Sequence, residues 1–402
     1  MKAQALAHAH STIPDPRPEG RAPVVLQVLP RFSAGGVEWG AAEIAACLAR
    51  RGWTALVASE RGGLEQRLRH EGGRHVRLPL ASKNPGTMAL NVGRLARLIE
   101  SEGVDIVHAR SRAPAWSAYF AARRTGRPFI TTFHGTYFDG GWFKRRYSSV
   151  MLRGEPTIVI SQFVRDEILA HWSIDPGRLR LIPRGVDLSR FDPAKVAPDR
   201  VVALARQWRL PDGVSVVMMP ARLARWKGHE VLIQALAKLA RHDLCCVMVG
   251  EADRHPRLQE ELMARVRRLA LEGAVRFVGR CDDMPAAYLL ADVVVSASIQ
   301  PEAFGRVIVE AQAMGRPVIA SAHGGAGETI VHGETGFLVA PNDAAALAEC
   351  LAGVLALKPD ERKALVERAA HSARSTYATE RMCERTLAVY DEVLRQAVAR
   401  AP

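Results

Sequence analysis

Short apolar runs alternate with amphipathic segments along almost the whole chain, and this alternation limits the possible folds. The apolar runs have the length of about four to eight residues that is typical of buried strands. Strands separated by helices predict βαβ units and mostly parallel sheets, an α/β fold. The expected strands are 23–29, 54–59, 74–78, 105–109, 128–133, 157–161, 180–183, 214–220, 245–250, 275–279, 292–297 and 318–321.

The chain has 402 residues, which favours two domains of ordinary size. The segment 192–209 is rich in proline, aspartate and arginine, and we expect the domain boundary there. The N-terminal residues lack the apolar core of a signal peptide, and no apolar run approaches the roughly 20 residues of a membrane-spanning helix. The expected divisions are a disordered tail over 1–22, a first domain over 23–195, a second domain over 196–381 and a final helix over 382–400.

The stretch 301–317, PEAFGRVIVEAQAMGRP, has the most specific pattern in the chain and follows the expected strand 292–297. Two carboxylates, Glu302 and Glu310, flank a turn at Gly305, and an amphipathic helix is expected after it. On a single helix these carboxylates would lie about 12 Å apart along the axis. We therefore expect Glu302 in the loop and Glu310 on the helix, where both can face one ligand.

The same turn suits a phosphate group. The backbone at Phe304, Gly305 and Arg306 would present free N–H groups and the positive end of the helix dipole. The alternative interpretation is an ordinary surface helix with two solvated acids.

Arg222 and Lys227 flank a loop at the end of the expected strand 214–220. An arginine and a lysine that converge there can neutralise a diphosphate through charge-assisted hydrogen bonds. The next expected strand ends at Gly250, where the backbone could line the same pocket. The alternative is a solvated basic loop.

In the first half, Gly35 and Gly36 follow a strand and precede a helix, so the backbone could approach a phosphate or a sugar closely. The GxGxxG spacing of a dinucleotide site is absent, and a tight turn without a ligand is the alternative. His134 follows the expected strand 128–133, at the strand end where open α/β sheets bind ligands.

Together these motifs resemble the retaining glycosyltransferases of family 4. That family has the GT-B fold, two Rossmann-like βαβ domains with a deep interdomain cleft and a C-terminal helix that crosses back onto the first domain. Its donor site has a glutamate, a Phe-Gly pair and a second glutamate at the spacing found here, and it pairs an arginine with a Lys-Gly five residues on. The resemblance covers nearly the whole chain after the tail.

The resemblance also implies a role for each residue. The expected catalytic residues are His134, Glu302, Arg222 and Lys227; the donor-binding residues are Gly250, Phe304, Gly305, Arg306 and Glu310; the acceptor-binding residues are Gly35, Gly36 and Glu38. Glu302 is expected to hold hydroxyls of the donor sugar and Glu310 those of the ribose. The expected route is front-face substitution with retention, in which the leaving phosphate takes the acceptor proton. We expect no metal and no cofactor beyond a UDP- or GDP-linked sugar as co-substrate.

Two positions depart from the family pattern. Arg184 stands where the family commonly has asparagine, which adds a positive charge at the cleft, and Gly327 stands where the family usually has proline.

The formal net charge of +13 favours an anionic partner. The segment 136–152 mixes aromatic and basic residues, which suits the surface of an anionic membrane or a phosphorylated glycolipid. The alternative is a solvated helix whose aromatic face packs into the core. The six cysteines have neither CxxC pairing nor zinc-ligand spacing, so we expect no structural disulfide and a location in the reducing cytoplasm. The segment 136–152 adds the expectation of contact with the cytoplasmic face of the inner membrane.

These features predict an enzyme that transfers a hexose from a nucleotide-diphosphate sugar to a glycan or glycolipid acceptor, such as the lipopolysaccharide core. A sugar-nucleotide epimerase with the same architecture is the alternative. A nucleic-acid-binding protein is a remote alternative, because the basic residues are scattered along the sequence.

Overall fold

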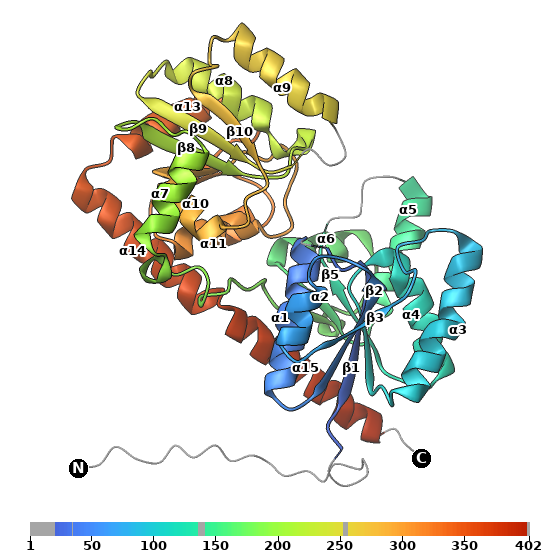
Figure 1. Ribbon diagram of the computed structural model, residues 1–402. Helices are drawn as coiled ribbons and strands as arrows, with labels where there is room; N and C mark the ends of the chain where they lie inside the picture. Colours follow the sequence, from blue (N-terminus) through green and yellow to red (C-terminus); the bar gives the residue numbers. More distant parts are fainter. Residues whose placement is uncertain (1–20, 34, 136–140, 252–255, 400–402) are drawn as a thin grey trace, which may run out of the picture.

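The protein consists of two lobes, each built on one parallel sheet with helices on both faces (Figure 1). This computed structural model describes residues 21–33, 35–135, 141–251 and 256–399. All strand pairs of both sheets are parallel, which confirms the expected βαβ architecture. The chain therefore has the βαβ units that its alternating pattern predicted, arranged as the two Rossmann-like domains that the family resemblance implied.

The first lobe contains a seven-stranded sheet in which every residue of the central strands β4 and β5 is buried. Its strands, in spatial order, are β3 (Arg74–Arg77), β2 (Thr54–Glu60), β1 (Val24–Arg31), β4 (Ile106–Ala109), β5 (Phe129–Phe133), β6 (Thr157–Val159) and β7 (Leu179–Leu181). Its helices are α1 (Gly36–Arg50), α2 (Glu65–His70), α3 (Pro85–Ser101), α4 (Arg112–Arg124), α5 (Gly141–Ser148) and α6 (Gln162–His171), with short 3₁₀ turns at Ser149–Leu152 and Pro176–Arg178.

The second lobe contains a six-stranded sheet. Its strands, in spatial order, are β10 (Val275–Gly279), β9 (Leu244–Val249), β8 (Ser215–Pro220), β11 (Val293–Ser296), β12 (Val318–Ser321) and β13 (Phe337–Val339). Its helices are α7 (Pro198–Gln207), α8 (His229–Leu239), α9 (Pro256–Arg268), α10 (Met284–Leu290), α11 (Arg306–Ala313), α12 (Ala326–Thr329), α13 (Ala344–Leu355) and α14 (Pro359–Thr376), with 3₁₀ turns at Pro193–Lys195 and Arg225–Lys227.

In each sheet the direction of strand succession reverses at one place, between β1 and β4 in the first lobe and between β8 and β11 in the second. At such a point the loops that follow the two neighbouring strands diverge and leave a crevice, where open α/β sheets bind their ligands. The motifs after β8 and β11 are therefore neighbours in space, although about 80 residues of chain, most of them folded as βα units, separate them.

The last helix, α15 (Thr379–Ala399), returns from the second lobe and lies along α1 of the first (Figure 1). The chain crosses between the sheets after β7, and the expected boundary segment 192–209 contains α7. The limits 23–195 and 196–381 stay predictions. Residues 1–20 of the expected tail and residue 400 of the expected helix lie outside the described residues, whereas Arg21, also placed in the tail, pairs with Asp105 at 2.6 Å.

One expectation about the cysteines is wrong. Cys47 of α1 and Cys383 of α15 form a disulfide across a sequence separation of 336 residues. Both positions face the contact between the two helices, and the crossing of α15 onto α1 brings them together. The disulfide therefore fixes the returning helix to the first lobe, and the absence of local cysteine motifs was no guide to it.

No helix in the described part of the chain has the length and apolarity that crossing a bilayer requires.

The disulfide predicts the number of reactive thiols. Protein unfolded in guanidinium without a reductant should give four thiols with Ellman's reagent, because Cys245, Cys246, Cys281 and Cys350 are free. Protein reduced with dithiothreitol and then freed of it should give six. Six thiols before reduction would contradict the Cys47–Cys383 bond.

Candidate functional site

The two loops at the switch point of the second lobe are joined by an ion pair. Lys227 ends the short turn after β8, and Glu302 lies in the loop after β11, as the sequence predicted for this glutamate. Lys227 Nζ lies 2.7 Å from Glu302 Oε1, and both side chains are mostly buried. Ser298 donates a hydrogen bond to the same carboxylate oxygen. The basic motif and the acidic motif therefore form one cluster.

Burial alone would raise the pKa of Glu302, but the Lys227 ammonium and the Ser298 hydroxyl outweigh it and hold the pKa below its usual value. Glu302 is therefore an anion at neutral pH, able to accept further hydrogen bonds. An ionised carboxylate has about four lone-pair sites, so its contacts with Lys227 and Ser298 leave capacity for ligand hydroxyls.

The turn before α11 requires a glycine. Gly305 has φ +82°, in the left-handed region, and is the residue from which α11 begins. Phe304, just before it, is buried with its ring against Tyr377. The anchored Phe304 and the permissive Gly305 place the start of α11 directly after the loop that carries Glu302.

Glu310 lies one turn into α11, as predicted, and each of its oxygens accepts one hydrogen bond. Oε1 accepts a hydrogen bond from Arg306 Nε at 2.7 Å, and Oε2 accepts one from the Tyr288 hydroxyl at 2.9 Å. Burial, and then the charge of Glu310, raise the pKa of Tyr288 well above its usual range, so its hydroxyl remains a donor. Sequence reasoning missed Tyr288, because a tyrosine in a short apolar helix gives no sign of its partner.

Arg222 and Gly250 follow the neighbouring strands β8 and β9. The Arg222 side chain is exposed, in contrast to that of Lys227. Gly250 packs directly against the backbone of Ala221 and Arg222, where a Cβ atom would come within 2.1 Å of the Ala221 carbonyl oxygen. The two residues are thus adjacent.

The glycine turn of the first lobe begins α1. Gly35 is the residue before the helix, and Glu38 lies in the first turn. Arg184, the departure from the family pattern, is buried and donates from Nη2 to the carbonyl oxygen of Gly36. It packs over Gly40, where a Cβ atom would lie 2.5 Å from Arg184 Nη1. Burial lowers the pKa of Arg184 to about 10, so it still carries its charge at neutral pH.

His134 directly follows β5, at the predicted strand end. Its Nε2 atom is buried and has no hydrogen-bond partner among the described residues. Burial, and then the charges of Arg184 and Arg110, hold its pKa well below the usual value. The imidazole is therefore neutral, with one nitrogen that no described residue satisfies.

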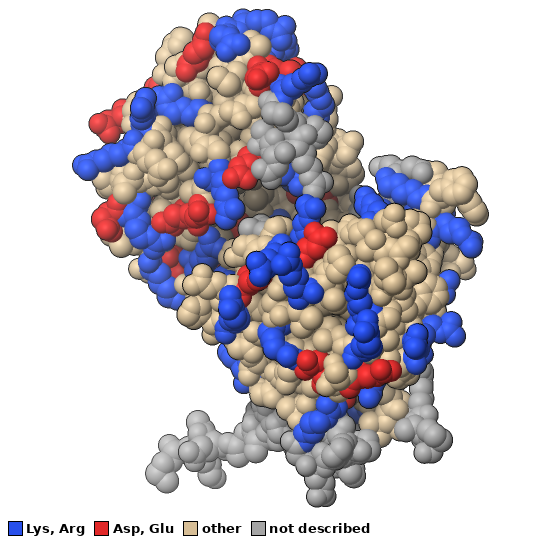
Figure 2. Space-filling view, turned by 45° about the vertical axis from the view of Figure 1, so that its right-hand side comes forward, with Lys and Arg blue, Asp and Glu red and all other residues tan. Residues whose placement is uncertain are grey.

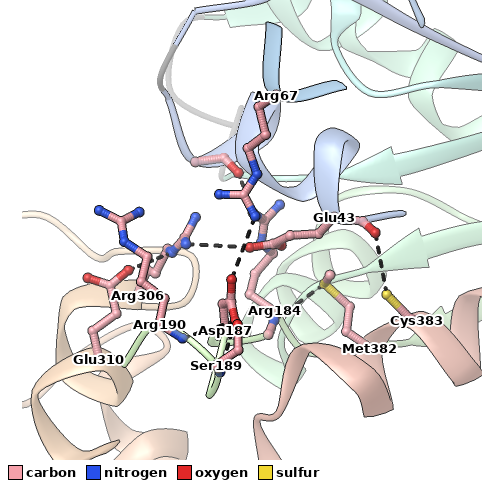
Figure 3. Close-up of polar contacts among 12 residues, drawn as sticks. Glu43, Arg67, Arg184, Asp187, Ser189, Arg190, Arg306, Glu310, Met382 and Cys383 are labelled. Atoms are coloured by element: carbon pink, nitrogen blue, oxygen red, sulfur yellow. Dashed lines mark hydrogen bonds and ion pairs between the residues drawn. The ribbon is translucent and has the colours of Figure 1, made fainter. Parts of the chain in front are cut away.

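A charged contact joins the two lobes across the cleft. Arg306 Nη2 lies 3.5 Å from Glu43 Oε1, which is deeply buried on α1 (Figure 3). Glu43 was missed from the sequence, although it is the lone acid in the apolar run Ala41–Ala46 and could have been noticed for that reason. The space-filling view shows a hollow between the two lobes (Figure 2).

The chain matches two protein-family models, one on each lobe. Residues 34–190 match the model "Glycosyltransferase Family 4", and residues 203–372 match "Glycosyl transferases group 1". A Mycolicibacterium smegmatis protein named GDP-mannose-dependent alpha-(1-6)-phosphatidylinositol monomannoside mannosyltransferase is 30% identical over 70% of this chain and 75% of its own length. The chain belongs to the glycosyltransferase family that these two models describe.

Other proteins are similar to this chain over different lengths. A Salinispora tropica protein named D-inositol 3-phosphate glycosyltransferase is 33% identical over 57% of this chain, and the matched region spans 49% of that relative's length. A glycosyltransferase of solved structure from Rickettsia africae has a TM-score of 0.86 and 39% identity, and covers 93% of this chain and 99% of its own. HepE of Anabaena, solved with UDP-glucose, has a TM-score of 0.82 at 24% identity over 92% of this chain and 99% of its own, which is a likeness of fold.

The buried histidine beside Lys227 predicts acid lability. His229 is 2% exposed, and burial lowers its pKa from 6.5 to about 4. Below pH 6.5 His229 is protonated in the unfolded chain, whereas in the folded protein it stays neutral until about pH 4. The free energy of unfolding therefore falls as the pH falls through this window. This one residue should contribute about 1.4 kcal/mol per pH unit there.

The measurement is urea unfolding at pH 7, 6 and 5 for the native protein, the variant His229→Leu and the exposed-site control His371→Leu. We expect a shallower pH dependence in His229→Leu and an unchanged one in the control. Equal slopes in all three proteins would contradict the neutral, buried state of His229.

Proposed function

We propose that the protein is a retaining glycosyltransferase that moves a hexose from a UDP- or GDP-linked sugar to an acceptor carrying negative charge. The observation that carries the proposal is the cluster at the switch point of the second lobe. There Lys227, Glu302 and the first turn of α11 lie together, with Glu310 one turn further along the helix. A cation, N–H donors and two acids in one crevice suit a diphosphate flanked by two sets of hydroxyls.

The chemistry requires stabilisation of a leaving group. The bond between the sugar C1 and the diphosphate oxygen breaks, and negative charge builds up on the diphosphate. Fixed cations and N–H dipoles placed where charge develops lower the barrier, and Lys227, Arg222 and the N-terminal turn of α11 would supply them. The acceptor oxygen bonds to C1 on the face that the diphosphate leaves, and the leaving phosphate takes the acceptor proton. No step in this route calls on a metal ion.

The two acids would divide the donor between them. Glu302, an anion held by Lys227, would accept hydrogen bonds from the hexose hydroxyls, and Glu310 would accept those of the ribose. His134, neutral and with Nε2 unpaired among the described residues, would face the hexose from the first lobe. Gly35, Gly36 and Glu38 would border the acceptor.

The names of the relatives suggest the class of acceptor. One is named for inositol 3-phosphate and another for a phosphatidylinositol monomannoside, and each name contains a phosphorylated polyol. With the net charge of +13, they support a phosphate-bearing polyol or glycolipid in preference to the narrower expectation of a lipopolysaccharide core. These matches are transferases and lend no support to an epimerase. Lysines and arginines are scattered over the visible face rather than gathered in a stripe, which disfavours nucleic acid (Figure 2).

We also propose that α5 contacts an anionic membrane surface. Trp142 is 64% exposed and Phe143 81% exposed, which contradicts the alternative that these rings pack into the core. Lys144, Arg145 and Arg146 follow them and are exposed. Aromatic rings with adjacent basic residues suit the interface of anionic lipids. Residues 136–140 of the predicted segment lie outside the described residues.

Replacement of the central cation tests the donor site. Lys227→Met should lower the rate of transfer from the preferred UDP- or GDP-sugar by about 10²–10³-fold, as loss of a group that stabilises developing charge does. A thermal-shift screen of UDP-, GDP- and ADP-sugars identifies that donor first, since a ligand that binds only the folded state raises the melting temperature. The control is Lys238→Met, an exposed lysine of α8. A Lys227→Met protein that is folded and fully active would overturn the proposal.

The membrane contact is tested by sedimentation with vesicles. The double variant Trp142→Ser/Phe143→Ser should lose most of its binding to phosphatidylglycerol vesicles, and the native protein should bind phosphatidylcholine vesicles weakly. Met263→Ser, at a 41% exposed position of α9 in the second lobe, is the control. If the double variant binds as well as the native protein does, α5 is not the contact.

A further inference from the structure

We propose that Arg306 couples nucleotide binding in the second lobe to closure of the first lobe onto the second. Its guanidinium group would do so by binding Glu310 and Glu43 at the same time. The proposal rests on the assignment of Glu310 to the ribose. Arg306, in the first turn of α11, would then be a positioning residue that holds the two lobes in their relative orientation when nucleotide is bound.

The geometry of Arg306 suits a bridge. Its Nε atom donates to Glu310 within the same helix at 2.7 Å, and its Nη2 atom faces Glu43 of the other lobe at 3.5 Å. Figure 3 shows the guanidinium between the two carboxylates. The fork of an arginine lets one side chain bind two acids at once in a fixed arrangement, which a lysine ammonium does less well.

The buried carboxylate of Glu43 is stabilised by its contact with Arg306 when the two lobes are close together. Its side chain is 3% exposed, and neither carboxylate oxygen accepts a hydrogen bond from any described residue. Burial raises its pKa, opposed first by the charge of Arg306 and then by that of Arg184. A buried carboxylate without hydrogen bonds is costly unless a cation compensates it. Arg184 of the first lobe supplies part of that compensation in either arrangement, and Arg306 adds the larger part only when the lobes are close.

Glu310 connects this contact to the ligand. Its carboxylate holds Arg306 through one oxygen and Tyr288 through the other, and lone pairs remain for two ribose hydroxyls. Hydrogen bonds from the ribose would fix the carboxylate, and with it the guanidinium in the orientation that reaches Glu43. Because binding linkage is reciprocal, the Arg306–Glu43 contact must then strengthen nucleotide binding as much as the nucleotide strengthens the contact.

A second contact across the cleft lacks this connection. Both oxygens of Glu328 accept hydrogen bonds at the start of α6, from Gln162 N at 2.7 Å and from Phe163 N at 2.6 Å. No described contact joins Glu328 to Glu310 or Arg306. The Arg306–Glu43 pair is therefore a charged cross-lobe contact that shares a residue with the donor site, and Arg306 also lies 5.9 Å from the ring centroid of Trp39 on α1.

The test measures the affinity for UDP and for GDP by titration calorimetry in the native protein, Glu43→Gln, Arg306→Gln and the double variant. Glu43→Gln keeps the shape of the side chain and removes its charge. It should weaken binding of the preferred nucleotide at least about fivefold, the lower end of typical coupling between sites. The double variant should bind no more weakly than Arg306→Gln alone, because Glu43 acts through Arg306. Glu102→Gln, which removes a carboxylate paired with Arg74 inside the first lobe, is the control and should bind normally.

Small-angle scattering supplies a readout that a local effect at Glu43 would not move. Nucleotide should reduce the radius of gyration of the native protein more than that of Glu43→Gln. Native affinity in Glu43→Gln, or additive losses in the double variant, would overturn the coupling and leave the proposed function intact. If the native protein binds neither nucleotide, the proposed function fails, and the coupling fails with it.

Discussion

The ion pair between Lys227 and Glu302 is the contact on which the arrangement of the second lobe's site depends. Each residue comes from a different βα loop, and the two loops meet because β8 and β11 are neighbours at the switch point of the sheet. The pair holds a cation and an anion side by side in a mostly buried crevice. A ligand that carries both phosphate oxygens and sugar hydroxyls could bind Lys227 through the phosphate and Glu302 through the hydroxyls. A simple ion would be attracted by one of these side chains and repelled by the other.

The polar groups of the cleft form a continuous system rather than two separate sites. Arg306 links Glu310 to Glu43, and Arg184 holds the backbone of the glycine turn at Gly36. Charges this deeply buried are stable only when others compensate them. Arg184, which stands where the family commonly has asparagine, therefore helps to compensate the buried carboxylate of Glu43 in the same lobe.

Much of the fold could be predicted from the sequence, because strand ends and glycine turns are local signals. The placement of Glu302 in a loop and Glu310 on a helix followed from their spacing and from Gly305. Contacts between distant segments could not be predicted in this way. The Cys47–Cys383 disulfide depends on α15 crossing onto α1, and the contact of Glu310 with Tyr288 depends on how the fold brings α10 beside α11. The exposure of Trp142 and Phe143 likewise depends on which face of α5 meets the core.

A crystal structure of the protein with the UDP- or GDP-sugar that stabilises it tests the central claim most directly. We predict the diphosphate at the first turn of α11 with Lys227 Nζ in hydrogen-bond contact with it, Glu302 bound to the hexose and Glu310 to the ribose. A nucleotide bound elsewhere, with Lys227 still directed only at Glu302, would contradict the account.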